Sequence, residues 1–308
     1  MRYQGEGIEG VVMLAVVFGV AASGGAPVAT AAQDTADRPY LLEQVGDAAI
    51  VQLYADGFAS LTLRDKTLVW HLYQAALAGR DIYYDQRYEY NLEMREVLEE
   101  IITHPQGVDP ETLGAIHTYT KLFWINTGPF NNLTARKFVV ETTPTAFGAA
   151  VAAAARAGAT FPTHDGETLT RMVERMTPLF FDPDVDPIVT NKTPGPGEDM
   201  LLSSANNLYK GVSMADLEAF EERYPLTSRL VKVDGALVEE VYKVGGRYSD
   251  EISEIIRHLD AAIPYASEPM AKALRANVAY YRTGDPVDQR AYDIAWVEDR
   301  SSTVDTIN

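Results

Sequence analysis

The five histidines are the first residues to test for chemistry, because a helical zinc site needs imidazoles close together in the sequence. No two of them are three or four residues apart, and no His-Glu-x-x-His segment occurs. The chain also has no cysteine, which excludes disulfides and thiolate metal ligands. The sequence therefore predicts no metal ligand within this chain among His71, His104, His117, His164 and His258.

Adjacent acidic residues could suggest general acid–base catalysis, but their spacing argues against it. The pairs are Glu99-Glu100, Glu221-Glu222 and Glu239-Glu240. Adjacent side chains on a helix point apart and cannot share one site. The chain has neither a Gly-x-Ser-x-Gly elbow nor a phosphate-binding loop. We therefore predict solvated acidic faces and no catalytic residue in this chain.

One segment combines amides with aromatic rings, namely Asn126-Thr127-Gly128-Pro129-Phe130. Amides can pair with a peptide backbone, and rings can fill side-chain pockets. Alternatively, Asn126 could close the preceding helix by bonding to its backbone, as Asn often does before Gly. A peptide-binding surface and a helix terminus are both open. The surface would include the neighbouring rings of Tyr119, Phe123 and Trp124.

The last residues of the chain form a second candidate site. We expect a strand around Trp296, an acidic turn, and then an apolar run that stops in mid-pattern at Asn308. Such an end indicates that the chain was cut from a longer protein. A carboxylate forms strong charge-assisted bonds to an ammonium group. Asp305 is therefore a candidate to bind the free N-terminus of a peptide.

These two segments resemble the dipeptidyl peptidase III family of zinc exopeptidases, which remove dipeptides from peptide N-termini. The matches to the first motif are Asn126, Gly128, Phe130, Lys137 and Phe138. The matches to the second are Trp296, Asp299, Val304 and Asp305. The resemblance implies that substrate binding involves Asp305, Asn126, Gly128, Phe130 and Asn308.

The same resemblance implies a division of labour along the protein. The family's zinc motif, His-Glu-x-x-Gly-His, is missing here, so zinc belongs to the full-length enzyme and none is expected on this chain alone. In the whole enzyme, a zinc-bound water would attack the second peptide bond. Residues 32–308 would form the N-terminal lobe and part of the hinge of a two-lobed peptidase. A non-catalytic peptide-binding module derived from such a lobe is the alternative.

Net charge and apolar content indicate which kinds of partner the chain can bind. A net charge of -18 argues against nucleic acid and against anionic membrane surfaces. An apolar content of 46% in 308 residues is enough for a sizeable core. Peptides therefore remain the expected partners.

The N-terminus resembles a signal peptide. The apolar run of residues 11–22 is too short to span a bilayer, and Ala29-Thr30-Ala31 fits a cleavage site. Glu6 and Glu9 outweigh Arg2 in the flank, which is atypical. We predict that residues 1–31 are removed on export to the periplasm or cell exterior. The alternative is a leader on a cytoplasmic protein.

The remaining patterns predict a predominantly helical α+β fold with a minor antiparallel β component. Asp109-Pro110 is a strong helix start, and Asp234-Gly235 between two β-branched runs is a strong hairpin signal. An extended segment is expected at residues 33–44. Helices are expected at residues 54–79, 81–103, 109–125, 146–158, 168–176, 213–223, 249–263 and 268–283.

Overall fold

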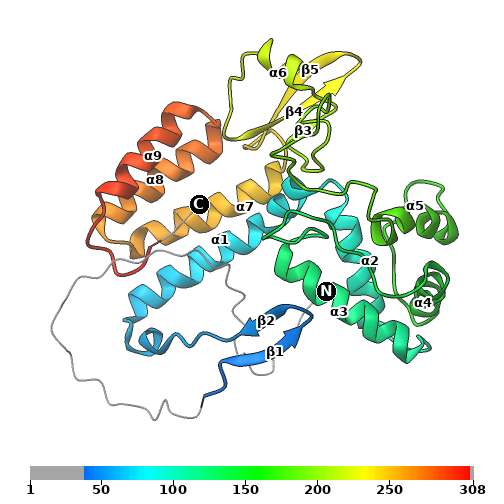
Figure 1. Ribbon diagram of the computed structural model, residues 1–308. Coiled ribbons are helices and arrows are strands. Elements are labelled where there is room, and N and C mark those ends of the chain that lie inside the picture. Colours follow the sequence, from blue (N-terminus) through cyan, green and yellow to red (C-terminus); the bar gives the residue numbers. More distant parts are fainter. Residues whose placement is uncertain (1–37, 306–308) are drawn as a thin grey trace. The chain divides into compact units, whose positions relative to one another are not determined.

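The computed structural model describes residues 38–305, drawn in colour in Figure 1. The chain divides into two units, Met1–Ser60 and Leu61–Asn308, which are described separately. No helix within the described range is long and apolar enough to cross a membrane. The predicted signal peptide and Asn308 lie outside the described residues.

The first unit contains a short hairpin. Strands β1 (Leu41–Val45) and β2 (Ala48–Val51) pair antiparallel, and a 3-10 helix, η1 (Asp56–Ser60), follows. The turn uses Gly46 at a φ of 56°, in the left-handed region that suits glycine. The sequence predicted only an extended segment here, because the flanking residues lack a strict alternation of apolar and polar types.

In the second unit, one core is built from four helices after α1. They are α2 (Asn91–Thr103), α3 (Pro110–Asn126), α4 (Pro144–Arg156) and α5 (Leu169–Phe181). Side chains of Asp109, Thr143 and Thr168 accept hydrogen bonds at the N-termini of the last three. We call the buried residues between them the first core; its largest fully buried rings are those of Tyr88, Phe123, Phe130, Phe147 and Phe180.

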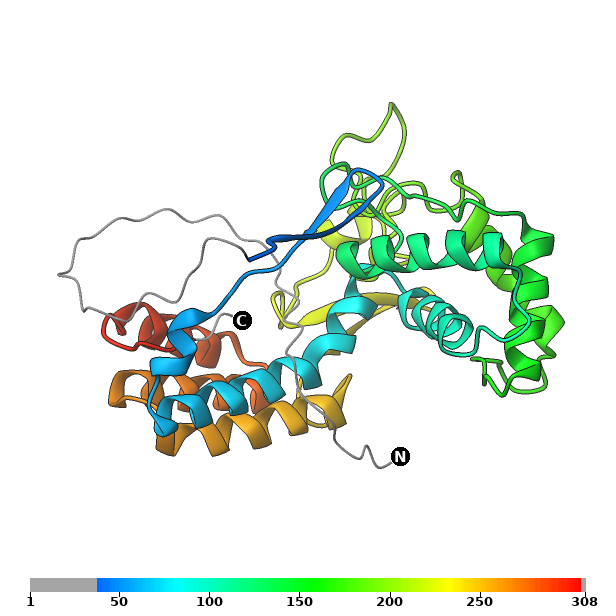
Figure 2. The same cartoon turned by 90° about the horizontal axis from the view of Figure 1, so that it is seen from below.

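A second core lies between α1 (Leu63–Arg87), α7 (Ser249–Ala262) and α8 (Glu268–Thr283), and a separate small cluster packs α8 against α9 (Pro286–Glu298). The short η2 (Ile263–Tyr265) joins α7 to α8. Both ribbon views show α1, α7 and α8 side by side (Figures 1 and 2). Helix α1 serves both cores, since Leu68 and Ala75 belong to the second and Tyr84 and Tyr88 to the first.

The length of α1 differs from the sequence prediction, which ended one helix at Gly79 and began another at Asp81. The helix instead continues to Arg87. A Cβ placed on Gly79 would lie 3.2 Å from Ile255 Cδ1, so the glycine allows close approach of α7. Tertiary packing therefore explains a glycine that resembled a helix end.

The predicted hairpin is confirmed. Strands β4 (Ser228–Val233) and β5 (Ala236–Val241) pair antiparallel, with Asp234 and Gly235 at φ of 50° and 81° in the turn. The two-residue β3 (Tyr209–Lys210) adds a parallel edge to β4, and the short helix α6 (Met214–Glu218) follows it. The predominantly helical α+β fold with a minor antiparallel component is likewise confirmed.

The strand predicted around Trp296 is wrong, because this residue lies in α9. Asp285 caps the helix by accepting from the Val287 N–H, and Pro286 occupies the first turn. Tyr292 and Ala295, three residues apart, are its buried positions. The buried positions thus follow helical spacing, although the β-prone residues of this segment suggested a strand.

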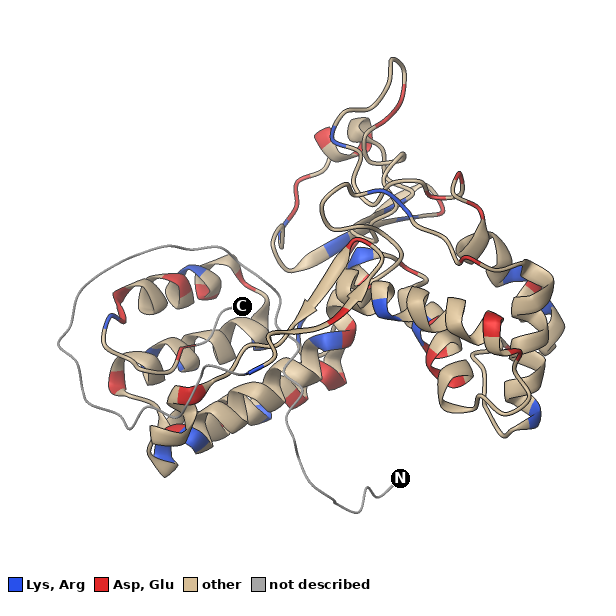
Figure 3. Cartoon of the chain, turned by 60° about the horizontal axis from the view of Figure 1, so that its bottom comes forward, with Lys and Arg blue, Asp and Glu red and all other residues tan. Residues whose placement is uncertain are grey.

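Acidic and basic residues are interspersed along the helices, as Figure 3 shows. Several pair locally, including Arg257 with Glu254 and Arg282 with Asp260. Such exposed pairs each contribute little to stability.

Candidate functional site

Asn126 uses its side chain to hold the loop that follows α3. Its Nδ2 donates to the Leu122 carbonyl at 2.9 Å, and its Oδ1 accepts from the Asn132 N–H at 2.8 Å. The residue is 7% exposed. Thr127 then adopts a left-handed conformation with φ of 53°, which ends the helix. This arrangement matches the helix-terminus interpretation; a contact of Asn126 with a peptide stays a prediction.

Gly128 lies where no side chain fits. Its φ is 132°, and a Cβ there would lie 2.7 Å from both Nδ2 and Oδ1 of Asn91. Asn91 is fully buried and donates to the carbonyls of Tyr84 and Thr127 at 2.8 and 3.1 Å. Glycine is thus required here because a buried amide packs against the backbone.

The ring of Phe130 is fully buried and contacts Tyr88 edge-on, with ring centroids 5.2 Å apart. Tyr119 and Phe123 are buried in the same core. Trp124 is half-buried, and its indole N–H donates to Glu99 Oε1 at 3.0 Å. In this structure the expected aromatic surface around the loop is therefore core packing, and the Phe130 ring is not exposed to a peptide.

The side chain of Lys137 joins its own segment to the C-terminal end of α5 and to the residues just after that helix. Its ammonium donates to the carbonyls of Pro178, Asp182 and Val185 at 3.3, 3.0 and 2.7 Å. A cation at a helix C-terminus interacts favourably with the negative end of the helix dipole. Burial lowers the pKa of this lysine, while the nearby aspartates act in the other direction. Lys137 thus has a structural explanation.

Asp305 lies in a different setting. The indole N–H of Trp296 donates to its Oδ1 at 3.0 Å, and the residue is exposed. Burial raises the pKa of Tyr292 to about 12, and the carboxylate of Asp305 adds to that shift. Both aromatic residues come from α9, so this helix positions the acidic residue at its side.

The two predicted segments belong to different parts of the second unit. Phe130 lies in the first core, whereas Trp296 packs on the small cluster of Ala273, Tyr292 and Ala295. The structure therefore does not bring the loop and Asp305 into one constellation through these side chains. Asn308, the fifth predicted site residue, lies outside the described range.

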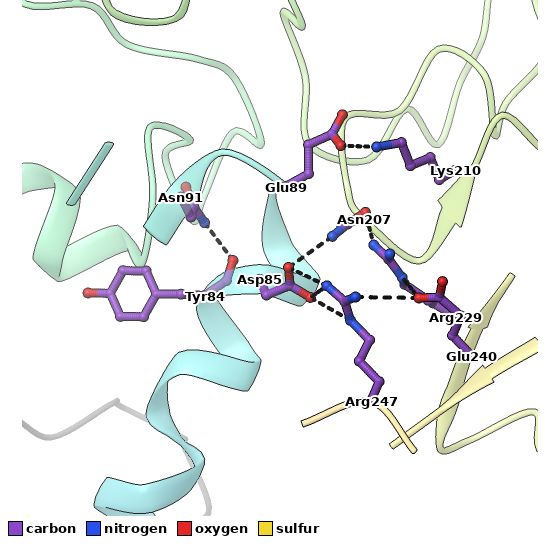
Figure 4. A network of polar contacts seen from close by, with 9 residues as sticks. All are labelled: Tyr84, Asp85, Glu89, Asn91, Asn207, Lys210, Arg229, Glu240 and Arg247. Atoms are coloured by element: carbon purple, nitrogen blue, oxygen red, sulfur yellow. Dashed lines mark hydrogen bonds and ion pairs between the residues drawn. The ribbon is translucent and has the colours of Figure 1, made fainter. Parts of the chain in front are cut away.

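Sequence reasoning missed a partly buried ionic network that joins α1 to β4, β5 and the segments before β3 and α7 (Figure 4). Arg247 Nη2 donates to both oxygens of Asp85 at 2.8 Å, and Arg229 Nε donates to Glu240 at 2.7 Å. Asn207 links the two pairs, donating to Asp85 at 3.2 Å and accepting from Arg229 at 2.6 Å. The two negative charges of Asp85 and Glu240 are balanced by the two positive charges of Arg229 and Arg247, so the network is suited to structural support.

Two histidines that are far apart in sequence meet between α1 and α7. The Nδ1 atoms of His71 and His258 are 3.4 Å apart, and Arg257 donates to the other nitrogen of His258 at 2.7 Å. Burial lowers the pKa of His71, as do the charges of His258 and Arg257. No group of three or more His, Cys, Asp or Glu among residues 38–305 could hold a metal ion. The residues present therefore do not fit a zinc site.

Comparison with known proteins gives one kind of match. No protein-family model matches the chain, and a search of curated proteins gives no match either. Its fold resembles part of dipeptidyl-peptidase III. DPP III from Caldithrix abyssi is 19% identical at a TM-score of 0.49, with 80% of this chain covering 35% of that one. Dipeptidyl-peptidase III from Corallococcus sp. strain EGB is 15% identical at a TM-score of 0.48, with 82% covering 36%. The chain thus spans about a third of each matched DPP III chain.

Proposed function

We propose that this chain is the peptide-binding part of a zinc-dependent dipeptidyl peptidase. The observation that carries the proposal is the carboxylate of Asp305, exposed and oriented by the Trp296 indole at 3.0 Å. A carboxylate forms strong charge-assisted hydrogen bonds to an ammonium group. An exopeptidase needs such a group to bind the substrate's N-terminus, because that contact sets which peptide bond is cleaved.

The residues of this chain bind and orient, and they perform no bond cleavage. In this proposal, zinc and the general base of the reaction come from another part of the enzyme, which would carry the His-Glu-x-x-Gly-His motif that this sequence lacks. When bound there, zinc would activate the attacking water. This chain alone is therefore expected to release no dipeptides. Metal-dependent release of dipeptides by the 308-residue chain would contradict this division.

Peptide binding can be measured directly on the full chain. We expect calorimetry to detect tetra-alanine with a free N-terminus and not its N-acetylated form. Asp305→Asn should weaken binding about tenfold to hundredfold, because the peptide ammonium then faces a neutral amide in place of a carboxylate. Glu298→Gln, which removes an exposed carboxylate from the same region, is the matched control. Equal binding of both peptides, or no effect of Asp305→Asn, would contradict the proposal.

Export is proposed on the N-terminal pattern alone. Expression of the full chain in a bacterial host with a secretory system should give a product that begins at Ala32. Intact-mass measurement of the product tests this. A cytoplasmic product that retains residues 1–31 would favour the cytoplasmic alternative.

A further inference from the structure

A cavity of about 580 Å³ opens between α1, α7, α8 and α9. Its size lies within the range of small-molecule sites in proteins. The residues around Leu226 and Thr227, just before β4, complete its wall. None of the interactions described for Asn126, Gly128 or Phe130 involves it. The cavity is therefore a separate candidate for binding.

Aromatic rings dominate the lining of this cavity, which we call the aromatic pocket. Tyr83 comes from α1, Tyr242 follows β5, and the other rings belong to α8 and α9. Tyr242 and Tyr292 are only 5% and 6% exposed, so they belong to the buried part of the wall. Aromatic rings attract cations through the ring quadrupole, with Trp the strongest. The six rings are Tyr83, Tyr242, Tyr280, Tyr281, Tyr292 and Trp296.

Among the residues that line the aromatic pocket, the formal charge has one sign. Asp293 lines it, and no Lys or Arg does so. Asp305 is bound to the pocket's Trp296, and the carboxylates of both aspartates add to the raised pKa of Tyr292. The whole chain carries -18, which also favours the approach of cations.

Two arginines of the chain approach the pocket and limit which rings are available. The Arg87 guanidinium lies 6.0 Å from the centre of the Tyr83 ring, so that ring already has a cation. Arg247 acts on the pKa of Tyr242, but its guanidinium is paired with Asp85. The rings from α8 and α9 are therefore the candidates to contact a bound cation.

We propose that the aromatic pocket binds a small organic cation, an alkylammonium whose apolar body packs against the tyrosines. The rings stabilise the charge, and Asp293 supplies the counter-charge at the rim. An anion would face carboxylates without a basic partner in the lining. The inference does not require that Asp305 bind a peptide, because the lining rings and Asp293 carry it.

Choline and its neutral isostere provide a matched pair of probes. Choline chloride and 3,3-dimethylbutan-1-ol share size and shape, but only choline is charged. Calorimetry on the full chain should detect choline and show the alcohol to bind at least about tenfold more weakly. Equal affinities would overturn the proposal in favour of a hydrophobic pocket, and absence of choline binding would overturn it outright.

Variants locate the site. Trp296→Leu should weaken choline binding about threefold to thirtyfold, whereas Trp70→Leu, at an exposed tryptophan on α1, should not. Tyr280→Leu serves as a second test should Trp296→Leu fail to fold. Asp293→Asn should weaken binding, and Asp288→Asn, which removes the same charge from the same helix, is its control. Equal effects of each variant and its control would overturn the assignment to this pocket.

Competition distinguishes the two sources of such a cation. Displacement of choline by tetra-alanine, but not by its N-acetylated form, would make the ligand a peptide N-terminus. Failure of the peptide to displace choline would make it a free small cation. Either result supports a cation pocket. Choline binding that survives in Asp305→Asn would separate this site from the proposed peptide anchor.

Discussion

The loop after α3 and the bundle of α1, α7, α8 and α9 use polar side chains in opposite ways. In the loop, the side chains of Asn126 and Lys137 form hydrogen bonds with backbone groups of the same chain. In the bundle, Asp293 and Asp305 are exposed beside a cavity lined by aromatic rings. A motif that resembles a binding segment can therefore owe its residue types to folding, and both binding sites proposed above lie outside it.

This contrast predicts that the loop matters first for stability. Phe130→Ala should lower the free energy of unfolding by about 3–5 kcal/mol, because a fully buried ring leaves a cavity. Chemical denaturation would measure the loss. Leu133→Ala in the same loop, at a side chain 96% exposed, should stay within about 0.5 kcal/mol of the parent. A small effect of Phe130→Ala would mean that its ring can leave the core.

A smaller loss is expected at Asn126. Asn126→Ala removes two hydrogen bonds and leaves the Asn132 N–H and Leu122 carbonyl without that partner. The expected cost is about 1–3 kcal/mol in unfolding free energy. Asn132→Ala keeps the backbone N–H that Asn126 accepts from and should cost less. A stable Asn126→Ala that loses peptide binding would reverse the comparison and make the loop a binding segment.

Local signals predicted the elements that depend on local chemistry. Asp109-Pro110 correctly placed the start of α3, and Asp234-Gly235 correctly placed the hairpin, because caps and tight turns are set by neighbouring residues. Asp285-Pro286 carries the same cap pattern at α9. There the β-prone residues that follow led to the wrong prediction of a strand.

Contacts between distant residues lay beyond the sequence. Gly79 resembled a helix end, but its role is to admit Ile255 from α7. Asp85 and Arg247 are 162 residues apart, and no local pattern indicates that they pair. The candidate site was predicted only in part for the same reason. Asp305 could be proposed from its chemistry, whereas the rings around the aromatic pocket come from segments between residues 79 and 296.

The smallest expected effect is a pH dependence of the unfolding free energy. It arises in the bundle, at the contact of His71 with His258, and not in the loop after α3. Burial lowers the pKa of His71 in the folded state from its ordinary value of 6.5, and the charges of His258 and Arg257 lower it further. The ring also stacks on Tyr265 at 6.0 Å, and Glu254 lies 3.3 Å from His258 Nε2. As pH falls below 6.5, the unfolded chain takes up a proton at this position before the folded chain does. His71 therefore stabilises the fold less at pH 5 than at pH 7.

His71→Gln should remove this part of the acid sensitivity while keeping a polar group next to His258. Denaturation of the variant and the parent at pH 7 and pH 5 should differ in their pH dependence by less than about 1 kcal/mol, with the variant the flatter. Asn132→Ala, which changes no titratable group, is the control for a change in stability without a change in pH dependence. A steeper acid loss in His71→Gln would show that the pair is stabilised by protonation, and the acid-sensitive contact would then have to be sought outside the α1–α7 interface.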